Sequence, residues 1–402
     1  MSTVVDKFLR YVKIDTQSNP NSESYPSTYK QRNLANLLLN ELKAFGLDAF
    51  VDEFSYVYTK IPANTSTKGH KIGLIAHLDT SPDAPGANVN PKIIENYRGQ
   101  TINLNEFYQM DPTTSPNLLE VIGDDIIVTD GNTLLGADDK AGIAEIMQVI
   151  QEVISDTTFL HDDIYICFTP DEEIGQGTDK FDFDFFKADF AYTVDGGQVG
   201  SIEYENFNAA SAKIEITGKS FHPGSAKNQM INAIKLAFEF NSMLPSNEIP
   251  EQTEGYEGFF HLTNIKGQVE DAVIEYIIRD HDSNKFNNKK KLIEKIAYNI
   301  NQKYQYDAVN VTIKDQYYNM ITHLKDKNHI IEIAKKAIIT TGLSPISEPI
   351  RGGTDGANLT YKGLPTPNLG TGGYNYHGRY EFASINQMKK SVEILKNILM
   401  IK

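Results

Sequence analysis

The chain has 402 residues, 40% of them hydrophobic, and 38 lysine and arginine residues stand against 53 aspartate and glutamate residues, a formal net charge of -15. This length exceeds one ordinary hydrophobic core, so two domains are expected. The acidic excess repels phosphate backbones and anionic lipid, which argues against nucleic acid and membrane surfaces as partners.

The N-terminal segment has the pattern of a helix and lacks that of a secretory signal. Charged residues interrupt every apolar stretch, and Val5, Phe8, Leu9 and Val12 have amphipathic helical spacing. No apolar run is long enough to cross a bilayer. The single cysteine, Cys167, excludes an internal disulfide and is interpreted as a buried, inert thiol. We therefore expect a soluble, cytoplasmic protein.

The first half of the chain alternates between helix-like and strand-like segments. The apolar pattern predicts helices over 34–42 and 143–154, and buried strands over 72–76, 164–168 and 190–194. This alternation is typical of an α/β domain in which helices cover a sheet.

The pattern changes from about Ala210 onward. The order of predicted elements becomes βαββαβ, which is typical of a ferredoxin-like sandwich. The strands are expected at 212–216, 259–265, 273–278 and 309–313, and the helices at 228–243 and 285–301.

Glycine and proline dominate 345–378, and a last helix is predicted from Ile385 to the end. The simplest architecture is an α/β catalytic domain interrupted by a ferredoxin-like α+β insertion. We expect residues 1–207 and 317–402 to form the first domain and residues 208–316 to form the second.

The end of the strand over 72–76 is the first candidate site. Residues two apart in an extended chain point the same way, so His77 and Asp79 can share one face. A histidine that binds a metal through one ring nitrogen needs an acceptor for the other, which an aspartate supplies. The alternative is a histidine at a strand end beside a turn-capping aspartate.

A pair of adjacent acids, Asp138 and Asp139, precedes the helix over 143–154. A single aspartate there would be an ordinary N-cap. Two acids exceed what a cap requires, so one could bridge two cations while the other caps the helix.

Three acids follow the strand through Cys167, namely Asp171, Glu172 and Glu173. They repel one another unless a positive charge lies among them. One carboxylate could bind a metal and leave its neighbour free as a general base. The alternative is a solvated acidic loop.

Two further candidates, Asp195 and His377, adjoin glycines that allow close backbone approach. In open α/β sheets, sites form beyond the carboxyl ends of the strands, where His77, Glu173 and Asp195 are predicted to lie. With Asp138, the set offers two histidines and three carboxylates, which suits two zinc ions and one bridging acid.

The chain resembles a family of two-zinc metallopeptidases that includes tripeptide aminopeptidases, a bacterial glutamate carboxypeptidase, acetylornithine deacetylase and aminoacylase. The resemblance extends from Phe8 nearly to the C-terminus, is weak over 54–71, and is closest to the tripeptide aminopeptidases. Its matching strings are HLDTSPD, LLGADDKAGIAEI, FTPDEE, YTVDGG, FHPGSAK, EGYEGF, IRGGTDG and TGGYNYHG.

The resemblance implies a role for each candidate. His77 and Asp195 would hold one zinc ion, Glu173 and His377 the other, and Asp138 would bridge the two.

Two more acids would be catalytic without being ligands. Asp79 would orient His77, and Glu172 would be the general base. Related enzymes also have a cis peptide bond at the bridging acid, so one is expected between Asp138 and Asp139.

The insertion resembles the lid domain of the family, through which subunits of some members pair as homodimers. His222 is similar to a lid histidine that reaches the substrate carbonyl, from the other subunit in some members. Arg279 resembles an arginine that meets a substrate carboxylate, and Arg351 is a further candidate for substrate contact. For both arginines the alternative is a surface ion pair.

The expected activity is hydrolysis of the N-terminal peptide bond of tripeptides. A dipeptidase or an N-acyl amino acid deacylase would share the same metal ligands, so the ligands leave this choice open. A protein that binds metal or peptide without catalysis has no need of Glu172 beside the candidate ligand Glu173, which argues against that class. Structural zinc sites are compact and rich in cysteine, whereas these candidate ligands come from distant segments, which argues against a structural site.

Overall fold

The computed structural model describes residues 2–67 and 69–401, and the chain divides into two compact units. Unit 2 comprises Glu205–Thr322 and Pro349–Gly353, and unit 1 comprises the segments before, between and after them. The division confirms the prediction of an α/β domain interrupted by an inserted α+β domain. Within the described ranges, no helix is both long and apolar enough to span a membrane.

A mixed seven-stranded sheet forms the centre of unit 1. Its four middle strands are parallel, namely β8 (Ile164–Thr169), β3 (Ile72–His77), β9 (Phe190–Gly196) and β15 (Asn368–Gly370), and antiparallel strands flank them on both sides. Every residue of β3 and β8 is buried, as expected for strands covered on both faces. The order across the sheet is β1 (Ala49–Val51), β2 (Val57–Ile61), β8 (Ile164–Thr169), β3 (Ile72–His77), β9 (Phe190–Gly196), β15 (Asn368–Gly370) and β10 (Ile202–Glu203).

Side chains alternate between the two faces of this sheet, so each face has its own core. Leu74 and Ala76 of β3 pack into the larger core, whereas Ile75 packs into the smaller, aromatic one with Tyr56 and Leu359. Leu359 belongs to α8 (Asp355–Tyr361). The helices of the larger core are α1 (Val4–Tyr11), α2 (Gln31–Ala44), α3 (Ala137–Ser155), α7 (Asn328–Thr340) and α9 (Ile385–Leu399).

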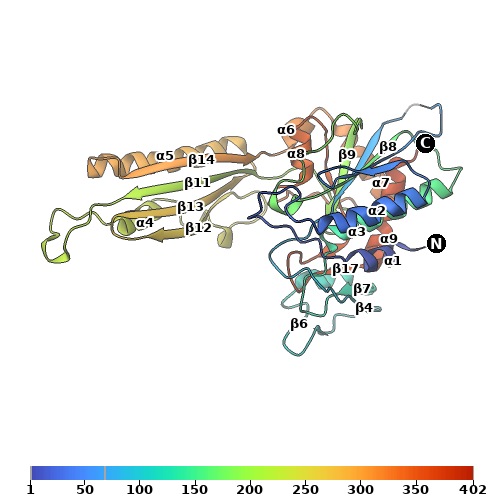
Figure 1. Cartoon of the computed structure of the whole chain (residues 1–402), viewed down its shortest axis with the longest axis horizontal. Helices are drawn as coiled ribbons and strands as arrows, with labels where there is room; N and C mark the ends of the chain where they lie inside the picture. The colour runs from blue at the N-terminus through green and yellow to red at the C-terminus, as the bar shows by residue number, and fades with distance from the viewer. Residues whose placement is uncertain (1, 68, 402) are drawn as a thin grey trace. The chain divides into compact units, whose positions relative to one another are not determined.

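A second, smaller sheet in unit 1 joins the C-terminal segment to the chain between α2 and α3 (Figure 1). Its order is β16 (Gly373–Tyr374), β17 (Phe382–Ser384), β7 (Ile126–Val128) and β4 (Lys92–Ile94). Tyr97, Leu118 and Phe382 share the core beneath it. The short strands β5 (Ile102–Asn103) and β6 (Gln109–Met110) pair with each other, and a further short helix is α6 (Ile321–Leu324).

Unit 2 contains the predicted βαββαβ succession. Its antiparallel sheet has the order β12 (Phe259–Gly267), β13 (Asp271–Asp280), β11 (Asn208–Thr217) and β14 (Val309–Tyr317). One face packs against α4 (Ala233–Ser242) and α5 (Ser283–Tyr304) in a separate core (Figure 1). The prediction placed the start of α4 at Asn228, which is wrong, because the Asn232 side chain caps the helix by accepting the Lys235 N–H.

Candidate metal centre

Four candidate residues lie at the carboxyl ends of the parallel strands in the large sheet, either on a strand or just after one. His77 is the last residue of β3, and Asp195 is the penultimate residue of β9. Glu172 and Glu173 begin the short 3-10 helix Glu172–Ile174, which follows β8. Because β3, β8 and β9 are parallel neighbours, these side chains come to one edge, where open α/β sheets form their sites.

The two remaining candidate metal ligands, Asp138 and His377, reach this end of the sheet from other elements. Asp138 lies in the first turn of α3, and its peptide bond to Asp139 is cis, as predicted. His377 lies in the loop between β16 and β17 and has a φ of 65°, a conformation that few residues other than glycine adopt.

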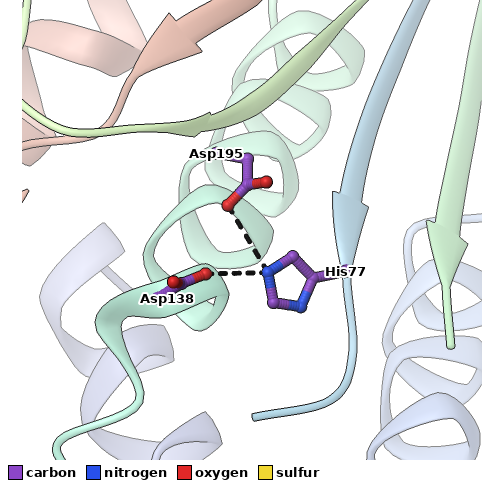
Figure 2. Close-up of side chains that lie close together, drawn as sticks. All are labelled: His77, Asp138 and Asp195. Carbon is purple, nitrogen blue, oxygen red and sulfur yellow. Dashed lines mark hydrogen bonds and ion pairs between the residues drawn. The ribbon is translucent and has the colours of Figure 1, made fainter. Parts of the chain in front are cut away.

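His77 is the centre of the first group of side chains (Figure 2). Its Nε2 lies 2.8 Å from an oxygen of Asp138 and 3.4 Å from an oxygen of Asp195. Figure 2 shows the histidine at the end of its strand, with Asp138 reaching it from the start of α3.

His377 is the centre of the second group, which shares Asp138 with the first. Its Nε2 lies 3.2 Å from the other oxygen of Asp138 and 3.0 Å from an oxygen of Glu173. Asp138 therefore presents one oxygen to each histidine. Within each group the potential ligand atoms lie within 4.8 Å of one another, so the structure brings all five predicted ligands together.

Asp79 contacts both His77 and the segment after β8. The Nδ1 atom of His77 lies 3.0 Å from the backbone carbonyl of Asp79 and 3.5 Å from its carboxylate. The two carboxylate oxygens accept the backbone N–H groups of Glu172, at 3.0 Å, and Glu173, at 3.2 Å. The fully buried Asp79 thus fixes the backbone of two acids and contacts Nδ1 of the histidine ring.

Asp139, within the first turn of α3, accepts backbone N–H groups, a role that the sequence left open for one member of the acidic pair. One oxygen accepts the Gly142 N–H at 3.2 Å, and the other accepts the His77 N–H at 3.1 Å. Its carboxylate is thereby used on backbone groups, whereas that of Asp138 faces the two imidazoles.

Negative charge accumulates at this edge. Burial raises the pKa of Glu173 to about 8 and that of Asp195 to about 6. Contacts with Asp138 and Glu173 raise the pKa of His377 to about 11. Burial opposes ionisation of Asp138, but hydrogen bonds from His377 and His77 lower its pKa below the usual range. Bound cations would stabilise the ionised forms of these closely spaced acids.

The donor set fits divalent metal ions. Two imidazoles and three carboxylates, with no thiolate, suit zinc and similar ions. One oxygen of the buried Glu173 carboxylate also has no partner among the described residues, so it has an acceptor position to give to an ion. We conclude that the five side chains fit two ions that share Asp138.

Glu172 differs from its neighbour because it belongs to neither ligand group. Burial raises the pKa of its carboxyl well above the usual value. An acid with a raised pKa beside a cluster of candidate ligands has the properties of a general acid or base.

Two acids that contact the ligands were not identified from the sequence. The Asp83 carboxylate lies 3.4 Å from Nδ1 of His377. The Glu381 carboxylate accepts the backbone N–H groups of Leu135, Gly136 and Asp138. Asp83 lies in the string HLDTSPD, so the sequence resemblance could have identified it. Nothing in the local sequence pattern identifies Glu381.

His222 belongs to unit 2 and is exposed. It is the N-cap of the 3-10 helix Pro223–Ser225, and its Nδ1 accepts the Gly224 N–H at 3.1 Å. This contact fixes the ring on a tight turn and leaves Nε2 as the other ring nitrogen for a ligand.

The two candidate arginines also belong to unit 2. Arg279 donates to the Ala210 and Ile278 carbonyls and lies over the Tyr317 ring. Arg351 donates to the carbonyls of Thr253, Gly255 and Glu257 and to the Thr253 hydroxyl. Backbone carbonyls of unit 2 are thus partners of both guanidinium groups.

Known proteins resemble the chain along its whole length. Residues 204–307 match the model of a peptidase dimerisation domain. The chain is 54% identical over 402 residues to a peptidase T of Clostridium perfringens (strain 13 / Type A), which covers 100% of the chain and 99% of the relative. This similarity confirms the family resemblance found in the sequence.

Two solved structures share the fold. A tripeptidase from Staphylococcus aureus superimposes with a TM-score of 0.77 at 22% identity, over 98% of this chain and 96% of the other. A dinuclear metal-binding peptidase of the M20 family from Bacillus subtilis superimposes with a TM-score of 0.67 at 13% identity, again over 98% and 96%.

Proposed function

The chain is a peptidase that belongs to the peptidase T family, and we propose that it removes the N-terminal residue of tripeptides with two zinc ions. The observation that carries the proposal is the position of Asp138, whose two oxygens each face one histidine. The Staphylococcus aureus tripeptidase and the dinuclear Bacillus subtilis peptidase support it as relatives in fold.

Five side chains would hold the ions. His77 and Asp195 would bind one, Glu173 and His377 the other, and Asp138 would bridge them. When bound, such a pair of ions lowers the pKa of a shared water and polarises the carbonyl that the water attacks.

Glu172 would act as the base and then as the acid. Its carboxylate would accept the proton of the attacking water and pass it to the amine that leaves as the peptide bond breaks. Asp79 supports both roles, because its carboxylate holds the Glu172 backbone and faces His77. Hydrogen bonds to the backbone keep the base in place relative to the ligands.

Unit 2 would act as the lid. We assign substrate contacts to His222, Arg279 and Arg351, with His222 as donor to the developing oxyanion. The match to a peptidase dimerisation domain supports a homodimer formed through this unit. We assign catalysis to unit 1 and the lid to unit 2.

A panel of short peptides tests the proposal. Zinc-loaded enzyme should release the first residue of tripeptides faster than it cleaves di- or tetrapeptides, with products identified by chromatography. An N-acetylated tripeptide is the matched control and should be resistant. Equal cleavage of the acetylated peptide would instead establish a deacylase, and a preference for dipeptides would establish a dipeptidase.

Metal analysis tests the centre separately. Active protein at saturation should contain two divalent ions per subunit, and zinc should restore activity after removal by a chelator. Cobalt and manganese are expected to substitute in vitro. A content of one ion, or none, in fully active enzyme would overturn the two-metal proposal.

The short peptide substrate is consistent with the cytoplasmic location that the sequence predicts.

A further inference from the structure

We propose that Glu381 is a positioning residue, which locks the backbone leading into Asp138 to the loop that carries His377. By doing so it sets the affinity of the site that these two ligands share. The inference rests on the proposed two-metal function and concerns a residue outside the set that would touch metal or substrate.

The Glu381 carboxylate is 1% exposed and accepts three backbone N–H groups, two just before α3 and one in its first turn. One oxygen lies 2.7 Å from the Leu135 nitrogen and 2.8 Å from that of Gly136. The other oxygen lies 3.1 Å from the nitrogen of Asp138. A buried backbone N–H group without an acceptor is costly, so Glu381 removes that cost for three donors in the segment that leads into α3 and in its first turn.

The other end of Glu381 is attached to the loop of His377. Its own N–H donates to the Gly378 carbonyl at 3.2 Å, and β17 begins at the next residue. Because β17 pairs with β7, the base of the loop is anchored in the small sheet. One side chain therefore joins the bridging ligand to His377 across a separation of 243 residues between Asp138 and Glu381.

The chemistry of the contact requires a carboxylate. An ionised carboxylate accepts at both oxygens, and both are used here. A glutamine of the same shape has one acceptor oxygen, and its amino group would face a backbone N–H. In Glu381→Gln at least one donor near Asp138 would lose its acceptor, and the backbone would shift by a small distance.

Metal binding to the apo form of the full-length protein tests the proposal. We would titrate wild type, Glu381→Gln and Glu145→Gln with Zn²⁺ by calorimetry and record the absorption spectra of their Co²⁺ forms. Glu145 is the matched control, because it is a fully buried glutamate of α3 whose carboxylate contacts Ser391 of α9. Its substitution should leave metal affinity and the Co²⁺ spectrum unchanged.

Glu381→Gln should weaken one of the two binding steps by about 10–100-fold, as is typical when a group that orients a ligand is lost. Its Co²⁺ absorption spectrum should change, because the positions of the Asp138 and His377 side chains relative to each other would change. A second variant, Glu381→Asp, keeps both acceptor oxygens on a shorter arm and should give a smaller loss, which preserves the test if the glutamine variant does not fold.

Three results would overturn the inference. Glu381→Gln and Glu381→Asp could both bind Zn²⁺ with wild-type affinity and spectrum. Glu145→Gln could lose as much affinity as Glu381→Gln, which would indicate general destabilisation. Finally, wild type that binds fewer than two ions would overturn the proposed function together with the inference, whereas the first two results leave that function intact.

Discussion

The carboxylate of Asp79 accepts the backbone N–H of Glu172 at 3.0 Å. Its second oxygen accepts the next N–H along the chain, so Asp79 joins the end of β3 to the segment after β8. The same side chain also faces the His77 ring at 3.5 Å. A residue whose expected role was to orient a histidine therefore also positions the proposed base.

Replacing Asp79 should impair both metal binding and turnover. In Asp79→Ala the two backbone donors lose their acceptor and Nδ1 of His77 loses its carboxylate, so we expect metal affinity to fall by about 10–100-fold. Zinc titration and kcat/KM at saturating zinc separate the two effects. Activity that zinc restores completely would show that Asp79 has no part in placing Glu172.

Replacing Glu172 should remove turnover and spare the metals. Glu172→Gln keeps the shape of the side chain but cannot accept a proton, and loss of a general base typically lowers the rate by about 10²–10⁴-fold. Elemental analysis and kcat on a tripeptide are the measurements. Turnover close to that of wild type would exclude Glu172 as the base.

The strands that end at candidate metal ligands were predictable because the local sequence alone indicates a buried strand in each case. Buried runs such as 72–76 and 190–194 are continuous and apolar, and they end where the candidate acids and histidine begin. By contrast, β15 and α8 lie in the stretch rich in glycine and proline. Their structure depends on pairing with β9 and packing against distant aromatic residues, which no local pattern reports.

The candidate site likewise contains some residues that the local sequence indicates and others that only the folded structure reveals. Asp138 was a candidate as one of two adjacent acids before a helix and His377 because of the glycines beside it, and the family resemblance gave both residues their expected roles. Glu381 was missed because its partners are backbone N–H groups, and these leave no signature in the sequence of the donors. Its role depends on a contact between segments more than 240 residues apart.

His222 should be needed for turnover and not for metal content. If it donates to the oxyanion, His222→Ala should lower kcat by about 10²–10³-fold, the usual cost of one such donor. Kinetics on a tripeptide and metal analysis check this result. Unchanged kinetics would show that this histidine has no catalytic part.

A mixture of inactive subunits tests whether His222 acts across a dimer. Combining His222→Ala with Glu172→Gln subunits should restore partial activity if each active site takes its histidine from the partner. A mixture that stays inactive, although a mixed dimer is demonstrated, would assign the histidine to its own subunit.

The buried Glu145 predicts a pH dependence of stability. Burial raises its pKa in the folded protein well above the usual value, whereas the unfolded carboxyl titrates near 4.3. A raised folded pKa means that stability is present below the unfolded pKa and declines as pH rises toward the folded one. The free energy of unfolding of the wild type should therefore fall, relative to that of Glu145→Gln, as the pH rises above the unfolded pKa.

Denaturant unfolding of the two proteins between pH 5 and pH 8 measures this difference. One oxygen of Glu145 accepts from Ser391 at 2.5 Å and the other has no partner among the described residues, so the glutamine can keep the first contact. A difference in unfolding free energy that is constant across this range would contradict the prediction.

The position of β15 between β9 and β10 has a consequence for biosynthesis. Residues 368–370 fill a gap between strands that the ribosome has released long before, so β9 keeps an unpaired edge until the chain is nearly complete. The strands of unit 2 lie within 208–317 and can pair while translation continues. The nascent protein can therefore contain a finished insertion while the large sheet of unit 1 is still incomplete. Its period of greatest exposure to chaperones and proteases ends only when the last tenth of the chain emerges, and with it the histidine that completes the centre.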